Sequence, residues 1–208
     1  MAVDIDENEQ NDKLKELWAS YKNYIFIGSG LFLIIFLVFN FLSSKKIKEN
    51  ELASQLYQEV LIEKMDNMEI IQEKTEILKN NHGSSPYAGR ASLHLGQLLS
   101  KSGAHDKSVD ELKWSSVNAK EISIRSLAFY TMALNYVVLK DVPNAKISAQ
   151  SIESEGFEAL KNDLLGDIYL LEGNTNEARK AYAAALIFYE GRNDLSQVIQ
   201  TKIDALGK

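Results

Sequence analysis

The sequence predicts an all-α protein in which a single N-terminal transmembrane helix is followed by a solenoid of helical hairpins. Three observations predict this fold class. Residues 24–42 are apolar and uncharged, apolar residues downstream recur at helical spacing, and similar helix–turn–helix patterns recur along the C-terminal half. Nothing in the sequence resembles a series of strands.

The composition argues against several classes of function. The chain has 208 residues and a formal net charge of -6, of which residues 1–42 carry -3 (six acidic residues against three lysines), leaving -3 for the remainder. A near-balanced surface without a basic stripe argues against direct binding of nucleic acid. The absence of cysteine excludes a disulfide framework, a thiolate metal site and a cysteine nucleophile, and it fits periplasm and cytosol equally well.

The apolar segment, YIFIGSGLFLIIFLVFNFL, is predicted to span a membrane. As a helix its 19 residues reach about 28 Å, close to the thickness of the hydrocarbon core. Fourteen of them are Leu, Ile, Phe or Val, which together favour insertion by about 4–8 kcal/mol. Trp18, Tyr21 and Tyr24 fit the aromatic belt at a membrane interface.

Two alternatives for this segment are less consistent with the sequence. A buried core helix is usually amphipathic, whereas this segment is apolar on all sides. A cleaved signal peptide lacks support because 23 residues, rich in acidic side chains, precede the segment and no small-x-small cleavage site follows it. Its orientation stays open, since Lys13, Lys15 and Lys22 before it balance Lys45, Lys46 and Lys48 after it.

Helices are expected throughout the chain beyond Lys48. Leu52, Leu56 and Val60 are spaced as on one face of a helix, and a second apolar group follows at 70–78. Glycine-containing breaks at 82–85, 102–103, 173 and 191 separate segments of helical length. Pro86 and Pro143 are the two prolines, and Pro143 is expected in a turn or at the first helical position.

An internal repeat is clearest at residues 162–185, NDLLGDIYLLEGNTNEARKAYAAA. Residues that match the tetratricopeptide pattern L-G-x2-Y…A-x3-F…A are Leu165, Gly166, Tyr169, Ala178, Tyr182 and Ala185, although Asn162 replaces the usual tryptophan. We expect Gly166 and Ala178 where the two antiparallel helices touch, with Tyr169 and Tyr182 in the groove between them. Asn174 and Glu177 are expected to cap the second helix.

Two weaker copies precede it at intervals of 33 and 37 residues, close to the usual period of about 34. Their matching residues are Phe129, Met132, Ala133, Tyr136, Ala145 and Ala149 in one, and Leu95, Gly96, Leu99, Gly103, Ser108 and Leu112 in the other. The predicted organisation is a tail at 1–23, a transmembrane helix at 24–42 and a tetratricopeptide-like domain at 43–208. Within that domain we place repeats near 89–122, 126–158 and 159–190 and a capping helix at 194–206.

The whole chain resembles the YfgM family, the membrane-anchored ancillary subunits of the SecYEG translocon in Gram-negative bacteria. The resemblance is carried by the acidic tail and single anchor, by SPYAGRASLHLGQLL at 85–99, by EGFEALKNDLLGDIYLLEGNTNEARKAYAAAL at 155–186 and by TKIDAL at 201–206. It implies a bacterial inner-membrane location, a cytoplasmic tail and a periplasmic domain. It also implies association with the translocon and with a membrane-anchored prolyl-isomerase-like chaperone of the PpiD type.

The search for catalytic or metal-binding chemistry finds no coherent site. His82, His94 and His105 lack the spacing of metal ligands, and Asp163 and Asp167 are expected on a solvated helix face. The serines lack a nucleophile motif. We therefore expect no enzymatic activity, no cofactor and no metal.

A docking surface is the remaining candidate. If the first helix of each repeat lines the concave side, partner-binding residues are Arg90, Gln97, Lys101, Tyr130, Leu134, Val138, Asp163 and Asp167. Leu134 and Val138 fit either a bound peptide or a neighbouring helix. The leading hypothesis is a scaffold at the translocon that docks chaperones or clients during protein export. The alternatives are a scaffold for another envelope or cell-division assembly, and a regulator acting through its cytoplasmic tail.

Overall fold

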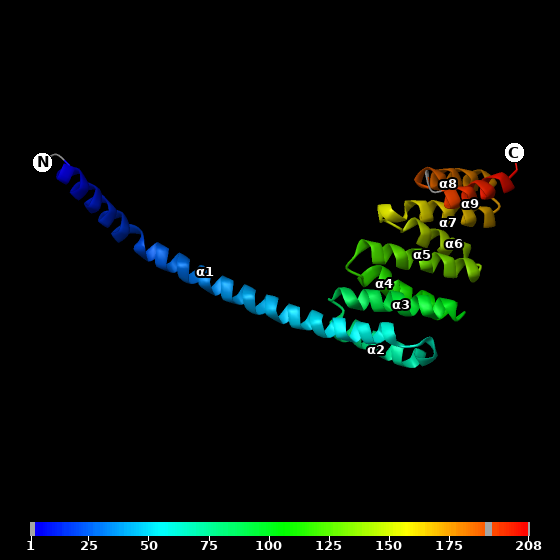
Figure 1. Ribbon diagram of the computed structural model, residues 1–208, viewed down its shortest axis with the longest axis horizontal. Helices are drawn as coiled ribbons and strands as arrows, with labels where there is room; N and C mark the ends of the chain where they lie inside the picture. The colour runs from blue at the N-terminus through cyan, green and yellow to red at the C-terminus, as the bar shows by residue number, and fades with distance from the viewer. Residues whose placement is uncertain (1–2, 190–192, 208) are drawn as a thin grey trace. The chain divides into compact units, whose positions relative to one another are not determined.

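The computed structural model describes residues 3–189 and 193–207, and within them every regular element is helical, as predicted (Figure 1). The chain divides after Lys48 into two compact units. Helix α1 (Val3–Ile62) begins in the first unit and ends in the second.

The first unit is the N-terminal part of α1. All side chains of residues 24–42 are exposed, and the most apolar window of this helix has a mean hydropathy of 2.6. By length and composition, α1 is the one helix of the described chain able to cross a membrane. A helix this apolar requires a non-aqueous environment, which a bilayer provides.

The second unit is a stack of helical hairpins that follow one another in chain order (Figure 1). After α1 its helices are η1 (Met65–Asn67), α2 (Met68–His82), α3 (Pro86–Lys101), α4 (His105–Asn118), α5 (Ile122–Val138), α6 (Val142–Gln150), η2 (Glu155–Phe157), α7 (Glu158–Leu171), α8 (Thr175–Phe188) and α9 (Asn193–Ala205). Helices α3 and α4, α5 and α6, and α7 and α8 pair within hairpins. Contacts of α4 with α5, α6 with α7 and α8 with α9 join the successive layers.

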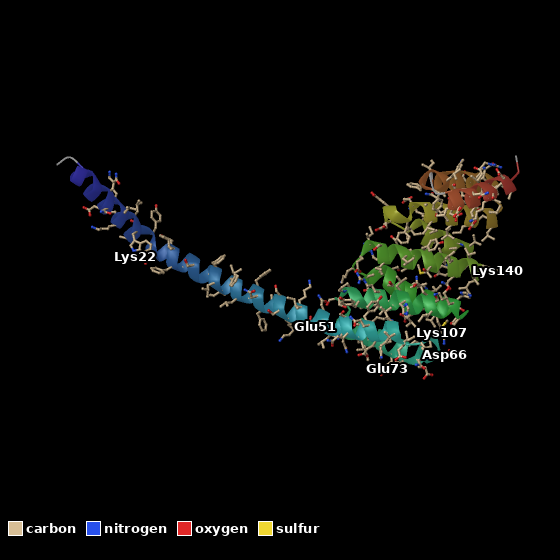
Figure 2. The ribbon with its side chains drawn as sticks, viewed as in Figure 1. Lys22, Glu51, Asp66, Glu73, Lys107 and Lys140 are labelled. Atoms are coloured by element: carbon tan, nitrogen blue, oxygen red, sulfur yellow. The ribbon has the colours of Figure 1, made fainter. Side chains whose placement is uncertain are left out.

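The turns inside the three C-terminal hairpins share one backbone conformation. Gly103 and Gly173 have φ angles of 82° and 76°, and Lys140 takes the equivalent position in the α5–α6 turn with φ 60° (Figure 2). A glycine therefore predicted two of these turns, whereas Pro143 indicated the third, in which a lysine takes the place of the glycine. The predicted break at Gly191 lies outside the described residues.

Side-chain caps start the second helix of two hairpins. The Asn174 side chain accepts a hydrogen bond from the Glu177 amide (3.3 Å), which confirms the predicted cap. Asp141 caps α6 in the same way, by accepting from the Asn144 amide at 3.2 Å. Pro143 lies in the first turn of α6, where its missing amide hydrogen costs nothing.

Residues 49–82 form a further hairpin, where the sequence indicated only a helical lead-in. Ala53 and Val60 of α1 are fully buried together with Ile71 and Leu78 of α2, in a core that continues into α3. The ammonium of Lys74 also lies 3.2 Å from the carboxylate of Glu59. This hairpin escaped detection because its turn contains no glycine and its one tyrosine, Tyr57, does not complete the pattern that marks the best repeat.

Small residues allow the paired helices to approach closely. A Cβ atom on Gly166 would lie 2.3 Å from the Tyr182 ring, and one on Gly96 would lie 2.7 Å from Leu112, so neither position has room for a larger residue. The prediction that Gly166 and Ala178 lie at the contact between the two helices is confirmed. Gly166 adjoins the Tyr182 ring, and Ala178 is fully buried in the apolar cluster that contains Tyr182.

Gly89 makes a comparable contact with the end of α4. A Cβ atom here would lie 2.5 Å from Ala119 Cβ and 2.6 Å from Ala119 Cα. The Gly89 carbonyl also accepts a hydrogen bond from the buried Ser115 hydroxyl at 2.9 Å. Sequence reasoning did not select Gly89, because its neighbour lies 30 residues away.

Gly89→Ala is expected to lower the free energy of unfolding by about 1–3 kcal/mol, because backbone atoms must move to admit the methyl group. Urea unfolding of the full chain in detergent, followed by circular dichroism, measures this loss. Gly156→Ala is the matched control, since the nearest atom to its added Cβ is the Ser154 hydroxyl at 4.0 Å. Equal stability of the two variants would contradict the close contact.

Candidate functional site

Helices α3, α5 and α7 adjoin on one side of the stack, and α9 joins them through Lys202. We call the accessible side chains of these four helices the odd-helix face. All eight predicted partner-binding residues are on α3, α5 or α7, and each is exposed or half-exposed. Gln97, Leu134 and Asp167 are at equivalent repeat positions. That the eight form one binding surface remains a prediction.

An ion cluster occupies the C-terminal part of this face. The Lys202 ammonium of α9 donates hydrogen bonds to Asp163 at 2.6 Å and to Asp167 at 2.8 Å, both on α7. These carboxylates lie on an accessible face, as expected, with the Asp163 side chain 24% and the Asp167 side chain 43% exposed. They are partly buried because α9 packs beside them, and Lys202 compensates their charge. Lys202 is the lysine of the segment TKIDAL. Its spacing from Asp163 and Asp167 along the sequence does not indicate that they pair.

Two tyrosines adjoin this cluster. The Tyr182 hydroxyl donates a hydrogen bond to Asp167 at 2.6 Å, and its ring lies 5.3 Å from the Lys202 ammonium. Burial, reinforced by Asp167, raises the pKa of Tyr182 well above its usual range. Burial acts to lower the pKa of Lys202, but hydrogen bonds to Asp163 and Asp167 outweigh it and raise that pKa. Tyr130 of α5 is the second tyrosine, and burial followed by the charge of Asp163 raises its pKa.

The centre of the face is apolar. Leu134 and Val138 of α5 are 39% and 58% exposed, although many apolar residues of this helix lie in the core. Part of each side chain therefore stays accessible beside the neighbouring helices, Val138 more than Leu134. These two side chains are apolar contacts that α5 offers to a partner, and other exposed apolar side chains of the face include Ile122, Leu170, Leu171, Leu195 and Val198.

Arg90 of α3 is held at the other end. It lies 2.6 Å from Glu121, at the start of α5, and 5.9 Å from the centre of the Tyr87 ring. Tyr87 in turn packs on Tyr57 of α1, with ring centres 5.7 Å apart. Arg90 therefore ties α3 to its neighbours, whereas Lys101 is exposed at the end of α3.

The histidines do not come together. His105 lies 2.7 Å from Asn135 Oδ1 across the α4–α5 contact, while His82 ends α2. Among the described residues, no group of three His, Asp or Glu side chains has the arrangement of a metal site.

His94 on α3 predicts a pH dependence. Burial, followed by the charge of Lys101, lowers the pKa of His94, so the unfolded chain binds this proton more readily than the folded chain. Stability should therefore be lost as pH falls below about 6.5. The urea midpoints of His94→Gln and the wild type are compared at pH 8 and at pH 5. On going from pH 8 to pH 5, the midpoint of the wild type is expected to fall further than that of His94→Gln. An identical difference at both pH values would contradict this.

A long apolar helix followed by stacked helical hairpins with an accessible odd-helix face defines the class of membrane-associated helical-repeat proteins. Residues 15–208 match the tetratricopeptide repeat-like domain family, and the chain belongs to this family. The match covers most of the apolar helix as well as the hairpins.

Curated relatives extend the similarity over the whole length. The chain is 26% identical to the ancillary SecYEG translocon subunit of Aggregatibacter actinomycetemcomitans, covering 99% of this chain and 100% of the relative. Proteins of the same name from Neisseria gonorrhoeae (22% identity, 99% and 100% covered) and Escherichia coli (23%, 99% and 99%) are also similar. These relatives confirm the resemblance to the YfgM family.

A solved structure also aligns with the chain. It is the crystal structure of nearly identical tetratricopeptide-like repeats of a Podosopora anserina putative kinesin light chain, with a TM-score of 0.47 and 14% identity. The alignment covers 78% of this chain and 95% of that chain.

Proposed function

We propose that this protein is a non-enzymatic adaptor of the bacterial inner membrane that associates with the SecYEG translocon. The observation that carries the proposal is the similarity over 99% of the chain to ancillary SecYEG translocon subunits, which includes the apolar helix. Anchoring restricts the protein to the membrane plane and raises its effective concentration near a membrane-embedded partner. The odd-helix face supplies a docking surface.

In the proposed topology, residues 1–23 are cytoplasmic and the domain from residue 43 onward is periplasmic. The lysines on the two sides of the apolar segment are balanced, so this direction rests on the family resemblance. The proposed role in the periplasm is to dock a chaperone of the PpiD type, or an exported client, during protein export. A reporter fused to the C-terminus tests the topology, and activity confined to the cytoplasm would overturn it.

Co-purification of the full chain from mildly solubilised membranes tests the association. SecYEG subunits should be recovered with the wild type, and their absence under conditions that keep the translocon intact would overturn the proposal. A parallel pull-down of the chaperone tests docking separately from anchoring.

A pair of variants assigns docking to the odd-helix face. Leu134→Asp with Val138→Asp places charges on the centre of this face, and we expect recovery of the chaperone to fall at least five-fold while SecYEG is retained. Ile147→Asp is the control, because Ile147 is a comparably exposed apolar residue on α6. An equal loss with both changes would assign docking to another surface.

A further inference from the structure

Helix α9 is the least buried helix of the C-terminal hairpins. Among its described side chains only Ile199 is fully buried, whereas α7 buries Leu164, Leu165 and Ile168. Gln197, Gln200 and Thr201 of α9 are exposed to solvent. Elements with few buried apolar contacts open locally before the rest of a protein unfolds.

Besides the packing of Ile199, polar contacts hold α9 in place. Lys202 binds Asp163 and Asp167, and the Arg179 guanidinium donates a hydrogen bond to the Gly207 carbonyl just beyond α9. The packing beside these contacts is incomplete. A cleft of about 390 Å³ remains there, lined by residues that include Leu170, Tyr182 and Leu206.

The surface under α9 has the composition of a helix-binding site. It combines Ala178, Tyr182 and Ala185 of α8, which pack against Ile199 and Ile203, with Asp163 and Asp167 of α7. We call these five residues the strap site. Removal of α9 would uncover apolar area, which is costly to leave in water, next to two carboxylates that lose their lysine partner.

We propose that α9 is a displaceable strap, and that the strap site binds an amphipathic helix of a partner that carries a basic residue in the position of Lys202. The inference rests on the proposed docking function and specifies the chemistry of the ligand. The template is α9 itself and the residue that follows it, where Ile199, Lys202, Ile203 and Leu206 give the pattern apolar-x2-basic-apolar-x2-apolar.

Charge supports the choice of a basic ligand. Asp163 and Asp167 share one ammonium group, so the three side chains together carry a net charge of -1 (two carboxylates and one lysine). A ligand with a second basic residue gains from this remaining charge, whereas an acidic helix is repelled. The spacing of the apolar template residues places them on one helix face, which excludes an extended strand.

Hydrogen exchange of the full chain in detergent tests whether α9 opens. Lys202→Glu should speed exchange of the α9 amides at least ten-fold and leave α3–α6 unchanged. Lys180→Glu is the matched control, because Lys180 is a 73% exposed lysine of α8 that pairs with Glu177 one turn away. If the two variants exchange α9 amides at the same rate, the strap proposal is overturned.

A labelled synthetic peptide of residues 193–206 tests the ligand. It should bind full-length Lys202→Glu at least ten-fold more tightly than the wild type, because the variant's own strap is released. A peptide with glutamate in place of its lysine should bind at least ten-fold more weakly. Failure of the first peptide to bind the opened variant would overturn the ligand assignment. Both measurements use the purified chain without a translocon. A negative result in them would overturn the strap proposal, whereas a negative co-purification would overturn the proposed association with SecYEG.

Discussion

Truncation of Tyr182 to alanine is expected to lower the free energy of unfolding of the α7–α9 region by about 3–5 kcal/mol. The side chain is among the largest that the described chain buries fully, and its ring fills the space that Gly166 leaves open. Its removal creates a cavity between α7 and α8 and deprives Asp167 of a hydrogen-bond donor. Urea unfolding of the full chain in detergent and hydrogen exchange measure the loss and its location.

Two further variants separate the contributions of the Tyr182 ring and the Tyr182 hydroxyl to this loss of stability. Tyr182→Phe keeps the ring and removes the hydroxyl that binds Asp167, and it is expected to cost about 1 kcal/mol. Phe188→Ala removes an aromatic ring from an exposed position on the same helix and should cost less than Tyr182→Ala. A similar loss in Tyr182→Ala and Phe188→Ala would mean that the hairpin does not depend on the Tyr182 core.

Two arginines in the apolar segment are expected to abolish membrane integration. Leu33→Arg with Ile34→Arg places both charges near the centre of residues 24–42, at a cost of about 5–7 kcal/mol, which is comparable to the whole gain of about 4–8 kcal/mol from the apolar side chains. The chain should then appear in the soluble fraction or in aggregates after alkaline extraction of membranes. The wild type should remain with the membrane pellet.

The control for this experiment lies on the same helix. Leu52→Arg with Ile62→Arg introduces the same charges at exposed apolar positions of α1 beyond the apolar segment. This variant should stay in the membrane pellet. Release of both variants, or of neither, would contradict the assignment of residues 24–42 as the membrane anchor.

The best repeat was predictable because its local pattern and its tertiary contacts coincide. Gly166, Ala178 and Tyr182 are close in sequence and meet across a single turn, so their spacing reports the contact directly. The hairpin of residues 49–82 was missed because its helices carry ordinary apolar patterns, and only their burial shows that they pair.

The candidate site was less predictable than the fold. Helical periodicity identified Asp163 and Asp167 as neighbours on one accessible face but did not show that Lys202 covers part of it. Their partner, Lys202, lies 35 and 39 residues further along the chain, beyond the range of any helical spacing rule. The exposure of Leu134 and Val138 likewise depends on what packs against α5, which the sequence of α5 does not state.

The sequence by itself determined the helical class, the apolar segment and the repeat that carries Gly166 and Tyr182, because composition, periodicity and turn chemistry act over short distances along the chain. Only the tertiary structure decided that residues 49–82 join the stack, that Gly89 adjoins Ala119 and that Lys202 neutralises part of the charge on α7. Those contacts depend on how hairpins stack, and stacking joins residues that no local pattern relates.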